Sequence, residues 1–344
     1  MRATMRLCIL AVLCGFSAQA GAQTVEQFYR GRTITMTIAA APGGVNDLAS
    51  RLVAQHLGKY IPGNPAIVSQ NIPGGAGVVG ANRMYNAAEK DGTVIAILDR
   101  GAPQVAILGD PNAKYDPIRF TWLGSISSYA EDAYVVAVNA GHPARSIHDL
   151  GKDGLTITLG AMNPGTTNLT FASIARDVLG LNIKIVRGYT GAAPMFLAMQ
   201  TGELDGQAVG LASLKAGQPA LWAQKQVRVL LQFGRSTRLP ELSDVPTGRE
   251  LAKDADALAM IEFAELPFFS ALPYIAPPDI PADRARALQS AFMATMKDPA
   301  FIDGANRLSL EMSPIDGDAV RALMVKAVAT PKAVIERYRQ IVGN

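Results

Sequence analysis

Short runs of β-branched residues alternate with amphipathic stretches along most of this 344-residue chain, and this alternation constrains its fold more than any other feature. Residues 33–40 predict a strand, which leads through Pro42-Gly43-Gly44 into a predicted helix over residues 47–59. The same pattern predicts further strands at 66–69, 94–98, 135–138, 155–159, 183–186 and 227–232, and further helices at 78–90, 167–179, 194–201, 282–296 and 318–341. Strands that alternate with helices are typical of α/β folds, so we expect an α/β fold with largely parallel sheets.

Two stretches have the composition of connections between lobes. One lies within residues 123–134, where a strand-like end meets a polar turn, and the other is the polar, proline-bearing segment 234–246. If both join the same two lobes, residues 23–126 and 239–344 form the first lobe and residues 127–238 form the second. Two α/β lobes with such connections enclose a cleft, which is the geometry of a protein that closes on its ligand.

The first 22 residues have the three regions of a secretory signal peptide. Arg2 and Arg6 precede an apolar run over residues 7–16, and small residues follow that allow cleavage after Ala20 or Ala22. The apolar run is too short to span a bilayer. We therefore expect an exported, periplasmic protein.

Removal of this segment would leave a mature chain without cysteine and with a small net charge. Both cysteines, Cys8 and Cys14, lie within it, so we expect no disulfide, thiolate metal site or cysteine nucleophile. Loss of Arg2 and Arg6 lowers the formal net charge from +3 to +1. So small a charge predicts no nucleic-acid partner.

The remaining side chains give no sign of catalysis or metal binding. The histidines His56, His142 and His148 have no His or Cys neighbour at metal-ligand spacing. The sequence contains neither a G-x-S-x-G nor an H-E-x-x-H motif. We therefore expect no catalytic residue, no bound metal and no cofactor.

Several glycine-rich loops instead lead into predicted helices. Residues 41–47 follow a strand and open a helix, residues 163–167 do the same in the middle of the chain, and Tyr189-Thr190-Gly191 precedes a third helix. The first N–H groups of a helix have no partner within it, and the aligned peptide dipoles favour an anion there. These loops are anion-site candidates, although each is also consistent with an ordinary turn in which Asp47 or Thr166 caps the helix.

One motif supports a different class of function. Residues Gly75 to Gly80 match the pattern G-x-G-x-x-G and follow a predicted strand, with a predicted helix after them. Asp99 ends the next predicted strand. This arrangement is similar to a dinucleotide-binding fingerprint, so the alternative is a nucleotide-dependent oxidoreductase. Ile72-Pro73-Gly74 separates the strand from the first glycine, however, where the fingerprint requires an immediate turn.

A set of short motifs occurs together between Phe28 and the C-terminus. They are Tyr29, the loop Pro42-Gly43-Gly44-Val45-Asn46-Asp47, Arg51, the stretch from Gln70 to Gly80, the turn from Ala88 to Gly92, Tyr115-Asp116-Pro117, Leu239-Pro240 and Asp244-Val245-Pro246-Thr247. In this combination the chain resembles the extracytoplasmic receptors of the tripartite tricarboxylate transporters, the Bug family.

Two positions depart from the family pattern. Thr190 stands where the family's V-P-Y-K-G stretch has a lysine, and Pro267-Phe268-Phe269 stands where a W-x-G stretch is usual. The identity of the bound carboxylate therefore does not carry over from the resemblance.

The resemblance implies a two-lobed periplasmic-binding-protein fold of the Venus flytrap kind, type II-like, with a ligand cleft between the lobes. It implies a monomeric receptor, not an enzyme, that binds a small organic acid and delivers it to the large and small integral membrane subunits of a transporter. Backbone amides from one loop of each lobe would hold the carboxylate. The ligand-binding residues we expect are Ala41, Gly43, Gly44, Asn46, Asp47, Asp99, Arg100, Met162, Asn163, Gly165, Thr166, Thr167, Tyr189 and Ser213.

Arg100 is the charged residue of most interest in this set. It follows the predicted strand 94–98 at the end where α/β sheets bind ligands. We hypothesise that Arg100, with Asp99 or Tyr189 nearby, binds the distal end of the ligand and favours a dicarboxylate through bidentate pairing. A receptor that reports to a membrane sensor kinase stays an alternative to transport.

Overall fold

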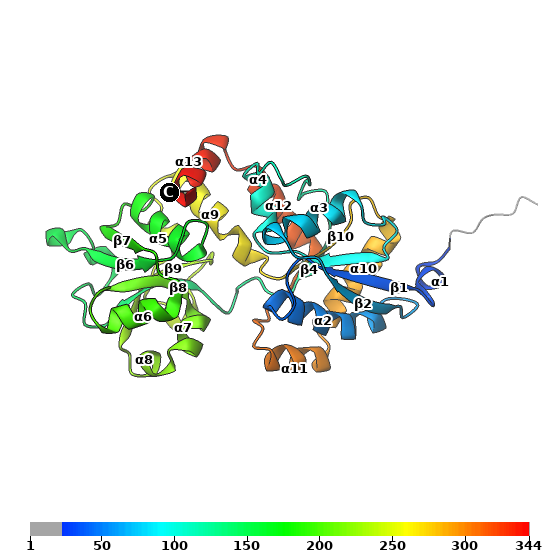
Figure 1. The fold of residues 1–344 in the computed structure, drawn as a ribbon, viewed down its shortest axis with the longest axis horizontal. Helices are drawn as coiled ribbons and strands as arrows, with labels where there is room; N and C mark the ends of the chain where they lie inside the picture. The colour runs from blue at the N-terminus through cyan, green and yellow to red at the C-terminus, as the bar shows by residue number, and fades with distance from the viewer. Residues whose placement is uncertain (1–22, 344) are drawn as a thin grey trace, which may run out of the picture.

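The computed structural model describes residues 23–343, and the predicted signal peptide lies outside this range. The chain forms two lobes that lie side by side, each built around its own β-sheet (Figure 1). The strands of the first lobe are β1 (Thr33–Ile38), β2 (Ala66–Asn71), β3 (Val94–Ile97), β4 (Thr121–Ser125), β10 (Pro273–Ala276) and β11 (Ile315–Asp316). Those of the second lobe are β5 (Tyr134–Asn139), β6 (Ile157–Ala161), β7 (Ile183–Arg187), β8 (Gly206–Gly210) and β9 (Val227–Phe233).

The helices surround these sheets. They are α1 (Val25–Tyr29), α2 (Val45–Leu57), α3 (Val78–Asn86), α4 (Ala102–Ile107), α5 (Thr167–Asp177), α6 (Ala192–Gln200), α7 (Leu211–Gly217), α8 (Pro219–Ala223), α9 (Ala255–Phe269), α10 (Ala282–Thr295), α11 (Pro299–Arg307), α12 (Gly317–Val328) and α13 (Lys332–Gly343). No helix within residues 23–343 is long and apolar enough to cross a membrane.

The first sheet has the strand order β11-β4-β10-β3-β1-β2 and is covered on both faces. Successive side chains of a strand point to opposite faces, so Ile95 and Ile97 of β3 pack towards α2, α10 and α11, whereas Ala96 and Leu98 pack towards α3 and α12. Burial on both faces explains why this strand is a continuous apolar run rather than an alternating one.

The second sheet has the order β7-β6-β8-β5-β9 and is also covered on both faces. Val136 and Val138 of β5 pack with residues of α5, α9 and α13. Val135 and Ala137 of the same strand pack with α6 and α7. Each lobe therefore has its own apolar core.

The expectation of largely parallel sheets is wrong. β1 pairs in parallel with β2 and β3, and β6 pairs in parallel with β7 and β8. By contrast β10 is antiparallel to β3 and β4, β11 is antiparallel to β4, and β5 is antiparallel to β8 and β9. β5 and β10 enter their sheets from the other lobe, so no helical crossover within one sheet imposes a parallel direction on them.

Within the described part of the chain, residues 23–343, the backbone passes between the two lobes three times, through residues 126–133, 270–272 and 329–331. The first passage lies within the predicted connection 123–134. The second predicted connection, 234–246, is not a passage, because Leu239 and Leu242 are buried in the core of the second lobe. The side chain of Gln232 also holds this segment, accepting from the Leu239 N–H and donating to the carbonyls of Leu242 and Val245.

The predicted lobe boundary at Leu239 therefore does not describe the packing. Both α9 and α13 lie against the second sheet, with Phe263, Val334 and Tyr338 buried in its core. The single helix predicted over residues 318–341 is also wrong, because it ends at Val328 and a new helix begins at Lys332. Pro331 lacks a backbone N–H and cannot continue a helix, so the chain turns here towards the second lobe.

Arg235 fastens the first connection between the lobes. Its side chain is buried, and its guanidinium donates to the carbonyls of Tyr129, Ala130 and Asp132 and to that of Thr237. Among these acceptors the Asp132 carbonyl belongs to a buried residue, and a buried carbonyl left without a partner costs about 1–3 kcal/mol.

We expect Arg235→Ala to lower the free energy of unfolding by about 2–4 kcal/mol, because several hydrogen bonds to a charged group are lost at once. Urea denaturation followed by circular dichroism measures this change. The matched control is Arg307→Ala, which removes an exposed arginine paired only with Asp303 and should cost less than about 1 kcal/mol. Equal effects of the two substitutions would contradict the role given to Arg235.

Candidate functional site

A pocket of about 610 Å³ lies at the N-terminal end of α2. Five of the residues predicted from the sequence line it, namely Ala41, Gly44, Asn46, Asp99 and Arg100. The other lining residues are Ala40, Pro42, Val45, Ser127, Tyr129, Ala271, Leu272, Ser309, Leu310 and Glu311. The wall therefore comes from the first lobe and from two of the connections between the lobes.

The first turn of α2 faces this pocket without a side-chain cap. Gly44 is the N-cap residue and has no side chain to accept from the helix N–H groups. Gly44, Val45 and Asn46 all line the pocket. The first N–H groups of a helix have no acceptor within it and carry a partial positive charge, so this end of the pocket is suited to an anion.

Asp47 shapes the loop from behind rather than lining the pocket. Its Oδ2 accepts from the Gly43 N–H at 2.9 Å, and its Oδ1 accepts from Arg51 Nε at 3.0 Å and from Asn71 Nδ2 at 2.9 Å. The hydrogen bond from Arg51 is the main reason that the pKa of Asp47 is lowered to about 2. Gly43 and Asp47 thus bind each other and are absent from the lining, and their predicted ligand contacts stay predictions.

Arg100 enters the pocket from the loop after β3. Its guanidinium lies 4.7 Å from the ring centroid of Phe268. Its side chain has no hydrogen bond or ion pair to any residue within 23–343, although a guanidinium carries five N–H donors. Phe268 belongs to an aromatic cluster with Tyr129, whose ring centroid is 4.8 Å away, and with Tyr134 at 5.6 Å. Arg100 is therefore a cation that lines the pocket, held against an aromatic ring with its N–H donors free of the described residues.

The predicted residues of the second lobe do not line this pocket. Met162, Asn163, Gly165 and Thr166 lie between β6 and α5, Thr167 is the first residue of α5, Tyr189 follows β7 and Ser213 lies on α7. Thr166 caps α5, accepting from the Leu169 N–H, as the ordinary-turn alternative predicts. The Tyr189 hydroxyl donates to Glu203 Oε1 at 2.6 Å. A ligand role for this set stays a prediction.

Sequence reasoning missed the part of the wall that comes from the connections and from residues 309–311. Ser127 and Tyr129 lie on the first connection, and Ala271 and Leu272 on the second. Glu311 joins these parts, because it accepts from the hydroxyls of Ser127 and Ser313 and from the Glu131 N–H. No local motif marks these residues, since only the packing of distant segments brings them together.

The glycines of the G-x-G-x-x-G motif serve close packing. A β-carbon on Gly77 would lie 2.7 Å from the Asp99 β-carbon, and one on Gly80 would lie 2.5 Å from the Ala39 β-carbon. Gly77 also has a φ of +88°, which favours glycine. The motif therefore lets the start of α3 approach β1 and the loop that carries Asp99.

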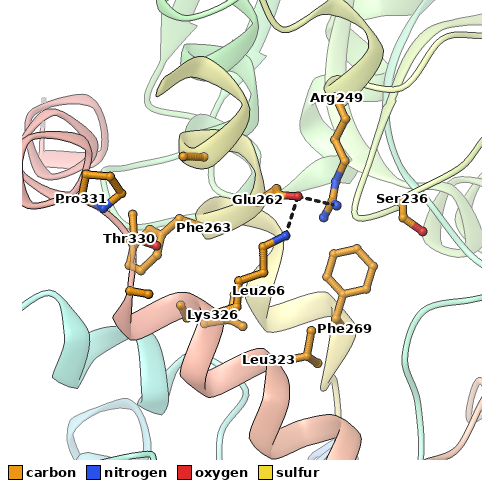
Figure 2. Close-up of a pocket in the computed structure, with 13 residues that line it drawn as sticks. Ser236, Arg249, Glu262, Phe263, Leu266, Phe269, Leu323, Lys326, Thr330 and Pro331 are labelled. Atoms are coloured by element: carbon orange, nitrogen blue, oxygen red, sulfur yellow. Dashed lines mark hydrogen bonds and ion pairs between the residues drawn. The ribbon is translucent and has the colours of Figure 1, made fainter. Parts of the chain in front are cut away.

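A second pocket, of about 470 Å³, lies between α9 and α12 (Figure 2). Arg249 and Lys326 converge on Glu262, with Arg249 Nη1 at 3.1 Å and Lys326 Nζ at 2.8 Å from Glu262 Oε1. Arg249 also binds Glu265, through Nε and Oε2 at 2.6 Å. Both cations of this pocket are thus paired within the protein, unlike Arg100. Within residues 23–343 no group of three His, Cys, Asp or Glu side chains could hold a metal ion.

The two lobes and a pocket at their junction define a two-lobed solute-binding protein, and comparison with known proteins gives the family. The sequence pattern of the tripartite tricarboxylate transporter family receptors, TctC, matches residues 49–339. This chain therefore belongs to that family of periplasmic solute-binding receptors, which is not a family of enzymes.

Individual known proteins are similar to this chain in sequence or in fold. A UPF0065 protein of Agrobacterium vitis, from the TAR-I ttuE-ttuC' intergenic region, is 26% identical over 91% of this chain and 82% of its own length. A TctC solute-binding protein from Polaromonas, solved without ligand, is 20% identical and has a TM-score of 0.70, with 90% of this chain and 99% of the other covered. MatC from Rhodopseudomonas palustris with bound malate is 20% identical and has a TM-score of 0.51, with 91% and 99% covered.

The buried carboxyl of Glu265 gives a prediction on pH. Glu265 is fully buried, and this burial raises its pKa from its ordinary value to about 7 in spite of the Arg249 guanidinium and the Gly234 N–H that bind it. The folded state thus keeps a proton that the unfolded state has lost, so the free energy of unfolding falls as the pH rises from about 4.5 to about 7. The expected contribution is of the order of 3 kcal/mol.

We expect Glu265→Gln to flatten this part of the pH profile of stability, because glutamine has no proton to lose. Urea denaturation of the wild-type protein and the variant at several pH values between 4.5 and 7.5 measures the difference. Glu89→Gln, which changes an exposed residue, is the control and should keep the wild-type profile. A Glu265→Gln profile parallel to that of the wild type would refute the prediction.

Proposed function

We propose that this receptor captures a small organic acid in the pocket at the N-terminal end of α2 and delivers it to the large and small integral membrane subunits of a tripartite transporter. The observation that carries the proposal is that the uncapped first turn of α2 and the unpaired guanidinium of Arg100 line the same pocket. Both favour negative charge, one through backbone N–H groups and the other through a full positive charge.

The energy available is adequate for a transport receptor. Hydrogen bonds to a charged group contribute about 1.5–3 kcal/mol each before the costs of association. Several such bonds to one carboxylate reach the roughly −8 kcal/mol that corresponds to micromolar affinity. Micromolar affinity for a carboxylate therefore needs no further buried positive charge.

Closure of the second lobe completes the site in this proposal. The loop from Met162 to Thr167 would approach the ligand by a rotation about the connections between the lobes. Ligands of the relatives support the chemical class, because MatC binds malate. Export to the periplasm follows from the predicted signal peptide, with cleavage after Ala20 or Ala22, and we expect the receptor to act as a monomer.

We expect a thermal-shift panel on the exported protein to show stabilisation by a group of carboxylates and none by NAD. A ligand at 100 times its dissociation constant adds about 2.7 kcal/mol of stability, which corresponds to a shift of several degrees. The panel should hold mono-, di- and tricarboxylates, aromatic acids and acidic amino acids. Stabilisation by NAD alone, with no acid active, would overturn the proposed function.

Arg100 gives a sharper prediction for the dicarboxylates of this panel. We expect Arg100→Ala to weaken the best dicarboxylate by about 10-fold or more, because one charge-assisted pairing is lost. A matching monocarboxylate should be affected less, and isothermal titration calorimetry measures both. Arg119→Ala is the control, since Arg119 is exposed, pairs with Asp279 and lies outside the pocket. An unchanged ratio of dicarboxylate to monocarboxylate affinity would exclude this role of Arg100.

A further inference from the structure

The pocket holds more negative than positive side chains, which is unexpected for a site that takes an organic acid. Arg100 is its single cation, whereas Asp99 and Glu311 are both acidic and both line it. Two carboxylates in the wall repel a ligand that carries only carboxylates. The acidic side chains of the wall therefore indicate that the ligand carries another polar group besides its carboxylates.

Glu311 has its hydrogen-bonding capacity largely occupied by the protein. It accepts from the Ser127 hydroxyl, from the Ser313 hydroxyl at 2.9 Å and from the Glu131 N–H at 3.1 Å. These donors hold the first connection to the segment that follows α11, so the chief role of Glu311 is to fix this junction.

Asp99 differs, because one of its carboxylate oxygens is unused. Oδ1 accepts from the Gly101 N–H at 2.9 Å, which orients the side chain. Oδ2 has no hydrogen bond or ion pair to any residue within 23–343. Gly77 makes room for this arrangement, since a β-carbon there would collide with the Asp99 β-carbon. The wall of the pocket thus includes a carboxylate with one oxygen left unpaired by the described residues, and Arg100 is the next residue in the chain.

We propose that Asp99 selects organic acids that carry a hydrogen-bond donor, a hydroxyl or an ammonium group, next to a carboxylate. This inference rests on the proposed function. Arg100 or the first turn of α2 would take the carboxylate, and Asp99 Oδ2 would accept from the neighbouring donor. An acid without such a donor leaves this acceptor desolvated and unpaired, and that mismatch discriminates more strongly than a missing apolar contact.

Sets of acids that differ at one position test this inference. Succinate, malate and aspartate share a four-carbon skeleton and carry hydrogen, hydroxyl and ammonium at one carbon; glutarate, 2-hydroxyglutarate and glutamate extend the comparison by one carbon, and propionate, lactate and alanine supply monocarboxylates. We expect at least one donor-bearing acid to bind the wild-type protein about 10-fold or more tightly than its donor-free counterpart, measured by calorimetry. The hydroxyl and ammonium arms show which donor the site takes.

Asp99→Asn should reduce this preference to less than about 3-fold, because the amide is a weaker acceptor than the carboxylate. The matched control is Asp116→Asn, since Asp116 is exposed, lies outside this pocket and also accepts from the N–H two residues ahead, that of Ile118. Circular dichroism checks that both variants fold. If Asp99→Asn does not fold, the wild-type ratios alone decide.

The outcomes separate this inference from the proposed function. Equal binding of donor-bearing and donor-free acids by the wild-type protein, or an unchanged preference in a folded Asp99→Asn variant, overturns the role of Asp99 but leaves the receptor function in place. Absence of binding by every acid of this and the preceding panel overturns the proposed function itself.

Discussion

The buried carboxylate of Asp47 is the contact on which the candidate site depends. It binds the Gly43 N–H on one side and the side chains of Arg51 and Asn71 on the other. These bonds tie the loop between β1 and α2, the start of α2 and the end of β2 into one unit. A carboxylate placed one turn later in the helix could not bind back to the loop, and an N-cap side chain would occupy the N–H groups that now face the pocket. The Asp47 carboxylate is therefore hydrogen-bonded within the protein, and the N–H groups of the first turn of α2 stay available to a ligand.

Other charged residues of the protein also divide into those paired within the protein and those available to a ligand. Arg249 and Lys326 pair with Glu262 between α9 and α12, and Arg249 also binds Glu265. The Arg235 guanidinium donates to backbone carbonyls. Arg100 has an aromatic face as its neighbour instead of an acid. An aromatic ring holds a guanidinium by cation–π attraction without using its N–H donors. Such a partner positions the cation while its hydrogen bonds stay available to a ligand.

Local sequence patterns predicted those strands and helices whose residue types are determined by the local structure. Residues 33–40 and 94–98 were predicted as strands and correspond to β1 and β3, because β-branched residues and continuous burial mark them. The sequence did not predict β8, because its first residue is Gly206 and glycine is unfavourable within a strand. The fold requires glycine at this position, since a β-carbon there would lie 2.3 Å from the Ala137 carbonyl oxygen. The lobe boundary failed for a similar reason, since a polar, proline-bearing segment such as 234–246 has the composition of a linker although two of its leucines are buried. The glycine loop before α2 was found because a turn into a helix is a local event, and Ser127 and Glu311 were not, because their meeting depends on the whole fold.

The break at Pro331 sends α13 back across the molecule onto the second sheet, where Val334, Tyr338 and Ile341 are buried. The core of the second lobe thus needs the last residues of the chain, and the core of the first needs α10 and α11, which follow the whole of the second sheet in sequence. Neither lobe can finish folding from an N-terminal fragment. Contacts between segments far apart in the sequence are therefore needed to complete either lobe, and the early strands alone are not sufficient.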